Sequence, residues 1–182
     1  MARVPFVEAV EGESPPELVA LYRDIAGLRG RVVNLYRALA NQPDALRAFM
    51  GMSRYIRDDA DFPADLRELA ILATGYAVGA EYEIHHHVPA ARRAGVSEAK
   101  LAAFPDWAAS DAFTETERAV IAYADQVART RDADDATFAA IRRLLPPGQV
   151  IDLALTCGWY HLVAAILGPL RIEIDGTGRS NE

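Results

Sequence analysis

Apolar residues recur along this chain at intervals of three and four positions, a spacing typical of helices with one buried face. Prolines, glycines and short polar runs interrupt the pattern and mark the ends of the helical segments. The pattern predicts helices at 15–30, 32–41, 43–59, 63–78, 81–94, 96–104, 114–130, 134–145 and 149–170. The segment RIEID near the C-terminus alternates like a strand, but it is too short and solitary to form a sheet.

Two of these helices begin with the spacing of a capping box, in which a Ser or Thr precedes a Glu by three residues. Ser14 and Glu17 have this spacing, and so do Thr114 and Glu117. The helix at 63–78 is apolar nearly all round in its middle, which predicts that it lies at the centre of the core. We therefore expect an all-α fold, a helical bundle that forms a single domain over residues 1–182.

Composition narrows the range of partners. The chain has 182 residues and a net charge of −7, and no basic stripe interleaved with aromatic residues, so nucleic acid and anionic membranes are not expected as partners. No signal-like apolar run opens the sequence, and we find no uninterrupted apolar run of roughly 18 residues. The single cysteine, Cys157, excludes an internal disulfide and a CxxC pair. A cytoplasmic location is the expectation.

The stretch EYEIHHHVP, residues 81–89, carries most of the candidate chemistry. Glu83 and His87 are four residues apart and share one helix face, where a carboxylate and an imidazole can act in proton transfer. Consecutive histidines on a helix diverge by about 100°, so His85 and His86 do not join His87 around one ion. Two alternatives stay open: an exposed Glu–His pair without function, and a metal site in which His161 joins Glu83 and His87.

Other polar and aromatic residues are candidates for the same site. Glu68 lies in the most apolar helix, which predicts a buried carboxylate that either relays protons or forms a salt bridge to an arginine. The arginines considered for that salt bridge are Arg67, Arg92 and Arg93. Four further residues are expected to line a substrate pocket, with an ordinary structural role as the alternative for each: Tyr76, Tyr82, His86 and His161.

The order of Glu68, AEYE at 80–83, His87, Ala91 and AGVS resembles the carboxymuconolactone decarboxylase family, which includes the alkylhydroperoxidase D and peroxidase-related branch. NLYRALANQPDAL, LRELAIL and FTETERAVIAYADQV also resemble segments of that family, so the likeness covers about residues 30–170. The resemblance implies the helical bundle of that family, with helices 63–78 and 81–94 as the antiparallel pair that carries the site. It also implies a homo-oligomer, a trimer or a multiple of it.

The alkylhydroperoxidase branch places two cysteines between its glutamate and its histidine, at the positions of Ala80 and Glu83 here. A thiol peroxidase needs those thiols, so the resemblance implies that this activity is absent. The decarboxylase branch resembles the chain in having a glutamate four residues before the histidine, but it does not share Glu68. Glu68 and His87 match the proton-relay pair of the peroxidase branch.

The expected function is that of a cofactor-independent lyase or isomerase of the decarboxylase type. Glu68, Glu83 and His87 are its expected catalytic residues, and they act on a small, carbonyl-activated, acidic substrate without a metal. Two alternatives stay open. The first is a cysteine-less peroxidase-related protein that binds a ligand or scaffolds a partner without turnover, and the second is a metal-dependent enzyme that uses Glu83 and His87.

Overall fold

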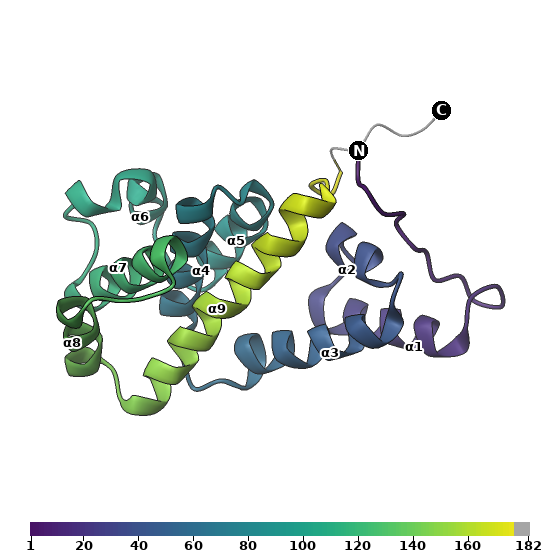
Figure 1. Ribbon diagram of the computed structural model, residues 1–182, viewed down its shortest axis with the longest axis horizontal. Helices are drawn as coiled ribbons and strands as arrows, with labels where there is room; N and C mark the ends of the chain where they lie inside the picture. The colour runs from purple at the N-terminus through teal and green to yellow at the C-terminus, as the bar shows by residue number, and fades with distance from the viewer. Residues whose placement is uncertain (177–182) are drawn as a thin grey trace. The chain divides into compact units, whose positions relative to one another are not determined.

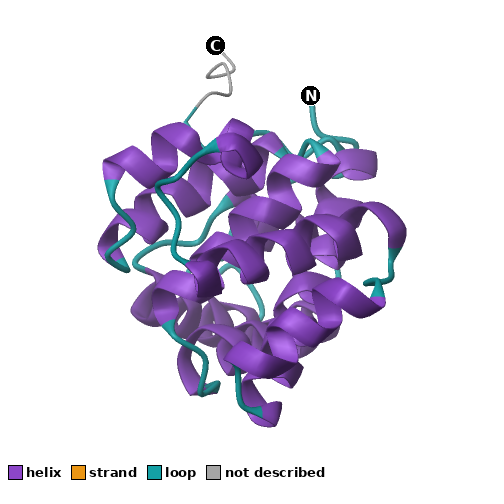
Figure 2. Ribbon diagram, turned by 90° about the vertical axis from the view of Figure 1, so that its left-hand side faces the viewer, coloured by secondary structure: helices purple, strands orange, loops and turns teal. Residues whose placement is uncertain are grey.

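The computed structural model of the protein describes residues 1–176, and this part of the chain is helical without a strand. Helices joined by loops fill the view in Figure 2. The all-α fold class predicted from the sequence is confirmed. In chain order the elements are α1 (Pro16–Arg29), α2 (Asn34–Leu39), α3 (Pro43–Arg54), η1 (Tyr55–Asp59), α4 (Ala64–Val78), α5 (Glu81–Arg93), α6 (Glu98–Ala103), η2 (Phe104–Ala109), α7 (Glu115–Thr130), α8 (Asp135–Leu144) and α9 (Pro147–Leu170).

The chain divides into two compact units, and the expectation of a single domain stays a prediction. Of the described residues, the first unit contains 1–58 and 167–176. Within it, the C-terminal segment is held against α2, because Asn34 Nδ2 donates to the carbonyl of Glu173 at 3.0 Å and Asp175 Oδ1 accepts from the Asn34 backbone at 2.9 Å. Arg29 forms an ion pair with Asp58 at 2.9 Å in the same unit.

The second unit contains residues 59–166 and is built around α4. Figure 1 shows α4 between α7 and α5, and α4 packs against both of them. Leu69 of α4, Val120 and Ile121 of α7, and Leu153 of α9 are fully buried in one hydrophobic core. The prediction of a central helix at 63–78 is confirmed, since every residue from Leu66 to Gly75 except Arg67 is buried.

The two predicted capping boxes have different outcomes. At Thr114 the side chain accepts from the backbone of Glu117, and the Glu117 carboxylate accepts from the backbone of Thr114, so this capping box is confirmed. The prediction at Ser14 is wrong, because Pro15 is the N-cap of α1 and no side chain caps the helix. The hydroxyl of Ser14 instead accepts from the backbone of Val10 at 3.0 Å, within the preceding turn.

Two further features of the helices differ from the sequence pattern. The predicted helix at 43–59 ends as α3 at Arg54 and continues as a π-helical turn, η1.

In addition, α9 is long and apolar enough to cross a membrane by length and composition alone, with 44% of its most apolar window buried. Buried core helices share these properties, so this observation is weak evidence for a membrane span.

Candidate active site

The site is built on the hairpin of α4 and α5. Gly79 ends α4 with a φ of 69°, a left-handed conformation that favours glycine, and the chain enters α5 two residues later. The backbone of Ala80 donates to the carbonyl of Gly75 at 2.8 Å. Gly75 also permits a close approach, because a Cβ built on it would lie 3.3 Å from Ile84 Cγ1 and 3.7 Å from Glu83 Cβ. The first turn of α5 therefore packs directly on the last turn of α4.

Glu68 of α4 and His87 of α5 meet in the interior of the second unit. Glu68 Oε2 lies 2.7 Å from His87 Nδ1, although the two residues are 19 positions apart in the sequence. Glu68 is 3% exposed and His87 is 6% exposed. A buried carboxylate is costly without a partner, and this short contact supplies one.

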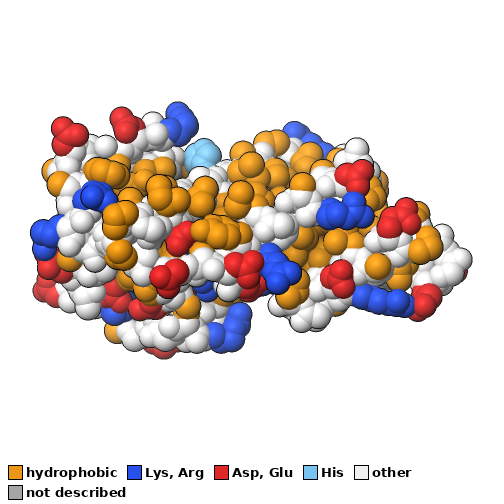
Figure 3. Space-filling model, turned by 90° about the horizontal axis from the view of Figure 1, so that it is seen from below, with side chains coloured by type: hydrophobic (Ala, Val, Ile, Leu, Met, Phe, Trp, Pro, Cys, Tyr) orange, Lys and Arg blue, Asp and Glu red, His pale blue; other side chains and the backbone are white. Residues whose placement is uncertain are grey.

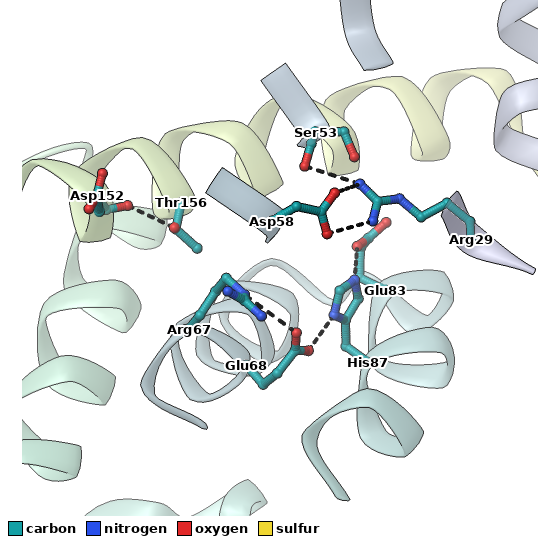
Figure 4. A network of polar contacts seen from close by, with 9 residues as sticks. All are labelled: Arg29, Ser53, Asp58, Arg67, Glu68, Glu83, His87, Asp152 and Thr156. Atoms are coloured by element: carbon teal, nitrogen blue, oxygen red, sulfur yellow. Dashed lines mark hydrogen bonds and ion pairs between the residues drawn. The ribbon is translucent and has the colours of Figure 1, made fainter. Parts of the chain in front are cut away.

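The other ring nitrogen of His87 faces a second carboxylate. Glu83 Oε2 lies 3.5 Å from His87 Nε2, as expected for residues four apart on one helix face, and Glu83 is 5% exposed. Figure 4 shows the imidazole ring between the two carboxylates, with Glu68 at one nitrogen and Glu83 at the other. The structure thus brings together the three residues that the sequence singled out, in one buried row, and their catalytic roles stay predictions.

Two further side chains adjoin this row. Arg67 Nε lies 3.8 Å from Glu68 Oε1, so the Glu68 carboxylate is placed between a guanidinium and an imidazole, as Figure 4 shows. The ring of Tyr160, on α9, packs edge-on against the His87 ring with centroids 4.8 Å apart. Arg92 was also considered as a partner of Glu68, but it forms an ion pair with Glu98 at 2.5 Å on the surface.

Sequence reasoning did not single out Tyr160, and it proposed its neighbour His161. Consecutive residues of a helix diverge by about 100°, so only one of the two can face His87. The structure places Tyr160 there and leaves His161 half-buried, with its Nδ1 lacking a hydrogen-bond partner in the described part of the chain. No local pattern shows which of the two residues faces His87, because α9 is apolar on most of its faces. The expected role of His161 as a pocket residue stays a prediction.

The remaining pocket candidates make ring contacts with other residues. Tyr76 is 37% exposed and stacks on Phe104, with ring centroids 5.4 Å apart. Tyr82 is buried and contacts the half-buried ring of His86, at 4.4 Å between centroids. Their expected role as pocket residues stays a prediction.

The single cysteine is placed where thiol chemistry is suppressed. Cys157 is 1% exposed, and burial raises the pKa of its thiol to about 12, although a hydrogen bond with Thr74 acts in the opposite direction. The thiolate is the nucleophilic form, so this thiol is inert at neutral pH. Among residues 1–176, no group of three or more His, Cys, Asp or Glu side chains is arranged to hold a metal ion.

Comparisons with known proteins agree with this architecture. The debrominase Bmp8, in the structure of a variant in complex with 2,3,4-tribromopyrrole, is similar with a TM-score of 0.81 and 21% identity, over 97% of this chain and 95% of that chain. An uncharacterized peroxidase-related protein from Silicibacter sp. TM1040 has a TM-score of 0.83 and 14% identity, over 96% and 92% of the two chains. An alkylhydroperoxidase AhpD core protein from Ralstonia eutropha JMP134 has a TM-score of 0.82 and 20% identity, over 96% and 93%.

These identities are low, so the likeness to solved structures shows the fold. No curated protein matches the sequence significantly. In the sequence itself, residues 43–126 match the profile of the carboxymuconolactone decarboxylase family. This segment includes α4 and α5 and therefore the Glu68–His87–Glu83 row. Over residues 43–126, the chain is therefore similar to the carboxymuconolactone decarboxylase family.

Proposed function

We propose that the protein is a cofactor-independent lyase or isomerase that moves a proton on a small, carbonyl-activated, acidic substrate. The observation that carries this proposal is the position of the His87 ring, which lies between the carboxylates of Glu68 and Glu83 with all three groups buried. An imidazole held at one nitrogen by a carboxylate keeps the other nitrogen available for proton transfer. The match of residues 43–126 to the carboxymuconolactone decarboxylase family supports the proposal.

The geometry supports the following proposed roles. Glu68 orients the imidazole through Nδ1, and a proton passes between His87 Nε2 and Glu83. The 3.5 Å separation at Nε2 is long for a hydrogen bond, but catalytic hydrogen bonds are often long in ligand-free structures and shorten in the substrate complex. Glu83 then exchanges the proton with the substrate carbon next to the carbonyl.

Decarboxylation is the reaction that the family name suggests. The bond between the substrate carbon and its carboxylate breaks, carbon dioxide leaves, and the electron pair is delocalised into the neighbouring carbonyl group. The Glu83–His87 pair then delivers a proton to that carbon. An isomerisation uses the same groups to remove a proton from one carbon and return it to another. Neither reaction needs an external oxidant or reductant.

Thiol-based peroxidase chemistry is not proposed. Ala80 and Glu83 stand where the peroxidase-related branch is expected to carry its cysteines, and the single thiol, Cys157, is buried and hard to ionise. A peroxidase of that type requires a thiolate and a second, resolving thiol. The debrominase likeness does not change this conclusion, because at 21% identity it shows the fold alone.

The proposal is tested by a proton-exchange screen. Metal-stripped protein is incubated with small lactone acids and β-keto acids in D₂O, and deuterium uptake and decarboxylation are followed by NMR. We expect turnover without metal, a loss of at least about 100-fold in His87→Ala, and an unchanged rate in the matched control His85→Ala, whose side chain is exposed.

Two outcomes would contradict the proposal and favour the alternatives. Activity that returns only when metal is added indicates a metal-dependent enzyme. Binding of panel compounds without exchange of any proton indicates a protein that has kept the fold and lost turnover. The homo-oligomeric state, the cytoplasmic location and the absence of nucleic-acid and membrane partners stay predictions.

A further inference from the structure

Arg67 is a charged residue beside the Glu68–His87–Glu83 row that the proposed mechanism does not use. Its side chain is 14% exposed, and its Nε atom is buried without a hydrogen-bond partner in the part of the chain that the structure describes. That atom lies 3.8 Å from Glu68 Oε1, while the other oxygen of the same carboxylate contacts His87. An arginine side chain is permanently charged, so this arrangement puts a fixed positive charge next to Glu68.

The charge state of Glu68 decides the direction of the hydrogen bonds along the row. An ionised Glu68 accepts a hydrogen bond from His87 Nδ1–H, and Nε2 then faces Glu83 free to accept a proton. A protonated Glu68 instead donates to Nδ1, and the ring carries its proton on Nε2. In that second state Nε2 cannot accept a proton from Glu83, so the relay runs in the opposite sense.

Without a nearby cation, the ionised state of Glu68 is unfavourable. The carboxylate is 3% exposed, and a second carboxylate, Glu83, lies on the other side of the His87 ring. Tyr160, which packs edge-on against the His87 ring, carries no positive charge. A cation at 3.8 Å whose side chain is only 14% exposed favours the ionised carboxylate, because little water screens the interaction.

We infer that Arg67 is a positioning residue of this site: its guanidinium keeps Glu68 ionised, which fixes a proton on His87 Nδ1 and leaves Nε2 to exchange protons with Glu83. The inference rests on the proposed function, because the direction of proton transfer matters only in a protein that moves protons. The geometry that carries it, however, is independent of any substrate.

The test reads the protonation of the His87 ring directly. Protein labelled with ¹⁵N-histidine is examined by NMR at neutral pH, where protonated and unprotonated ring nitrogens give well-separated signals. His87→Asn identifies the His87 signals among those of the four histidines of the chain. In the unaltered protein we expect Nδ1 to be protonated.

Three variants separate the effect of the positive charge at position 67 from the effect of altering the side chain. In Arg67→Gln we expect loss of the proton from Nδ1 and its appearance on Nε2, whereas Arg67→Lys, which restores the charge, keeps Nδ1 protonated. Arg93→Gln is the matched control, because Arg93 is an exposed arginine on α5 of the same unit. Circular dichroism checks that each variant is folded, and Arg67→Met replaces Arg67→Gln with the same expectation if the latter does not fold.

An unprotonated Nδ1 in the unaltered protein, or an unchanged Nδ1 signal in folded Arg67→Gln, would overturn the inference. The same change in Arg93→Gln would overturn it as well, because the effect would then not depend on position. Failure of this inference is distinguishable from failure of the proposed function. The NMR signals need no substrate, and the exchange screen with His87→Ala needs no alteration of Arg67.

Discussion

Glu68 Oε2 lies 2.7 Å from His87 Nδ1, and these two buried atoms join α4 to α5 at the centre of the second unit. Because both side chains are almost fully buried, neither finds water as a substitute partner when the other is removed. The pair therefore has two consequences that can be measured separately, one for stability and one for proton transfer.

Replacement of Glu68 by glutamine is expected to destabilise the protein. The amide keeps the size of the side chain but loses the charge that binds His87 and faces Arg67, so we predict a decrease of about 1–3 kcal/mol in the free energy of unfolding. Chemical denaturation measures this quantity. Glu81→Gln is the control, because Glu81 is an exposed glutamate at the start of α5, and its change is expected to stay within about 0.5 kcal/mol. Equal effects of the two substitutions would refute the importance of the buried pair.

Gly75 sets the distance between the two helices that carry the site. In Gly75→Ala the new Cβ meets Ile84 Cγ1 at 3.3 Å and Glu83 Cβ at 3.7 Å, so Ile84 has to shift by a few tenths of an ångström. We predict a loss of about tenfold in proton-exchange rate, because small misplacements of catalytic groups are costly. The better helix propensity of alanine, about 1 kcal/mol, offsets the strain, so stability changes little.

Gly51→Ala is the control for that substitution. Gly51 lies inside α3 with no atom within 4 Å of the added Cβ, so the change is expected to stabilise the protein by about 0.4–1 kcal/mol and to leave exchange unaffected. If Gly75→Ala exchanges protons as fast as the unaltered protein, the close approach at Gly75 does not position Glu83.

The ion pair of Lys100 with Glu117 gives the stability a defined dependence on pH. Burial, the largest single influence, raises the pKa of Glu117, but the hydrogen bonds from Lys100 at 2.5 Å and from the backbone of Thr114 together lower that pKa below its ordinary value of 4.5. A carboxyl group with a lowered pKa in the folded state adds stability above its unfolded pKa and loses it as the pH falls through the folded value.

We therefore predict that Glu117→Gln lowers the free energy of unfolding at neutral pH and that this difference shrinks as the pH falls below about 4.5, the ordinary pKa of the carboxyl group. Denaturation curves across an acid pH series measure the difference. Glutamine retains the size and much of the capping ability of glutamate at this position, which isolates the effect of charge. A difference that is constant over the whole series would contradict the assignment.

Cys157 is predicted to be unreactive in the folded protein. Burial raises the pKa of its thiol to about 12, so neither access nor ionisation favours attack on a disulfide reagent. Ellman's reagent is expected to release no colour from native protein and one equivalent from protein unfolded in guanidinium, in line with the single cysteine. Rapid reaction of the native protein with the reagent would contradict this prediction and would favour a thiol-based activity.

Exposed hydrophobic side chains are a further feature of the surface. Figure 3 shows such side chains among acidic and basic ones on one face of the molecule. On α9, the exposed large residues are Ile151, Leu155 and Leu162, and most other members of that helix are buried or half-buried. Surface residues of this kind are common in soluble proteins and do not by themselves define an interface.

Local patterns predicted much of the site. Glu83 and His87 share a helix face because they are four residues apart, and that relationship follows from helix geometry alone. The pairing of Glu68 with His87 depends on how two helices pack, so it was accessible only through the resemblance to a family. The contact of Tyr160 with His87 was not predicted, because the rotation of a mostly apolar helix about its axis cannot be inferred from the order of its residues.

The prediction at Ser14 failed for a different physical reason. A serine three residues before a glutamate matches a capping box, but Pro15 and Pro16 begin the helix one residue later than that pattern requires. The serine hydroxyl then finds its partner in the preceding turn, at the backbone of Val10. The same motif at Thr114 succeeded because no proline competes for the start of α7.

The most direct test of the central claim is a double-mutant cycle of Glu68 and Glu83, measured as the rate of deuterium exchange into a substrate found in the screen. If the two carboxylates and His87 move protons as one unit, Glu68→Gln and Glu83→Gln each reduce the rate, and the double variant is hardly slower than the worse of the two single variants. Two reductions that multiply in the double variant would show that the carboxylates act independently, and the account of a single proton-handling row would be wrong.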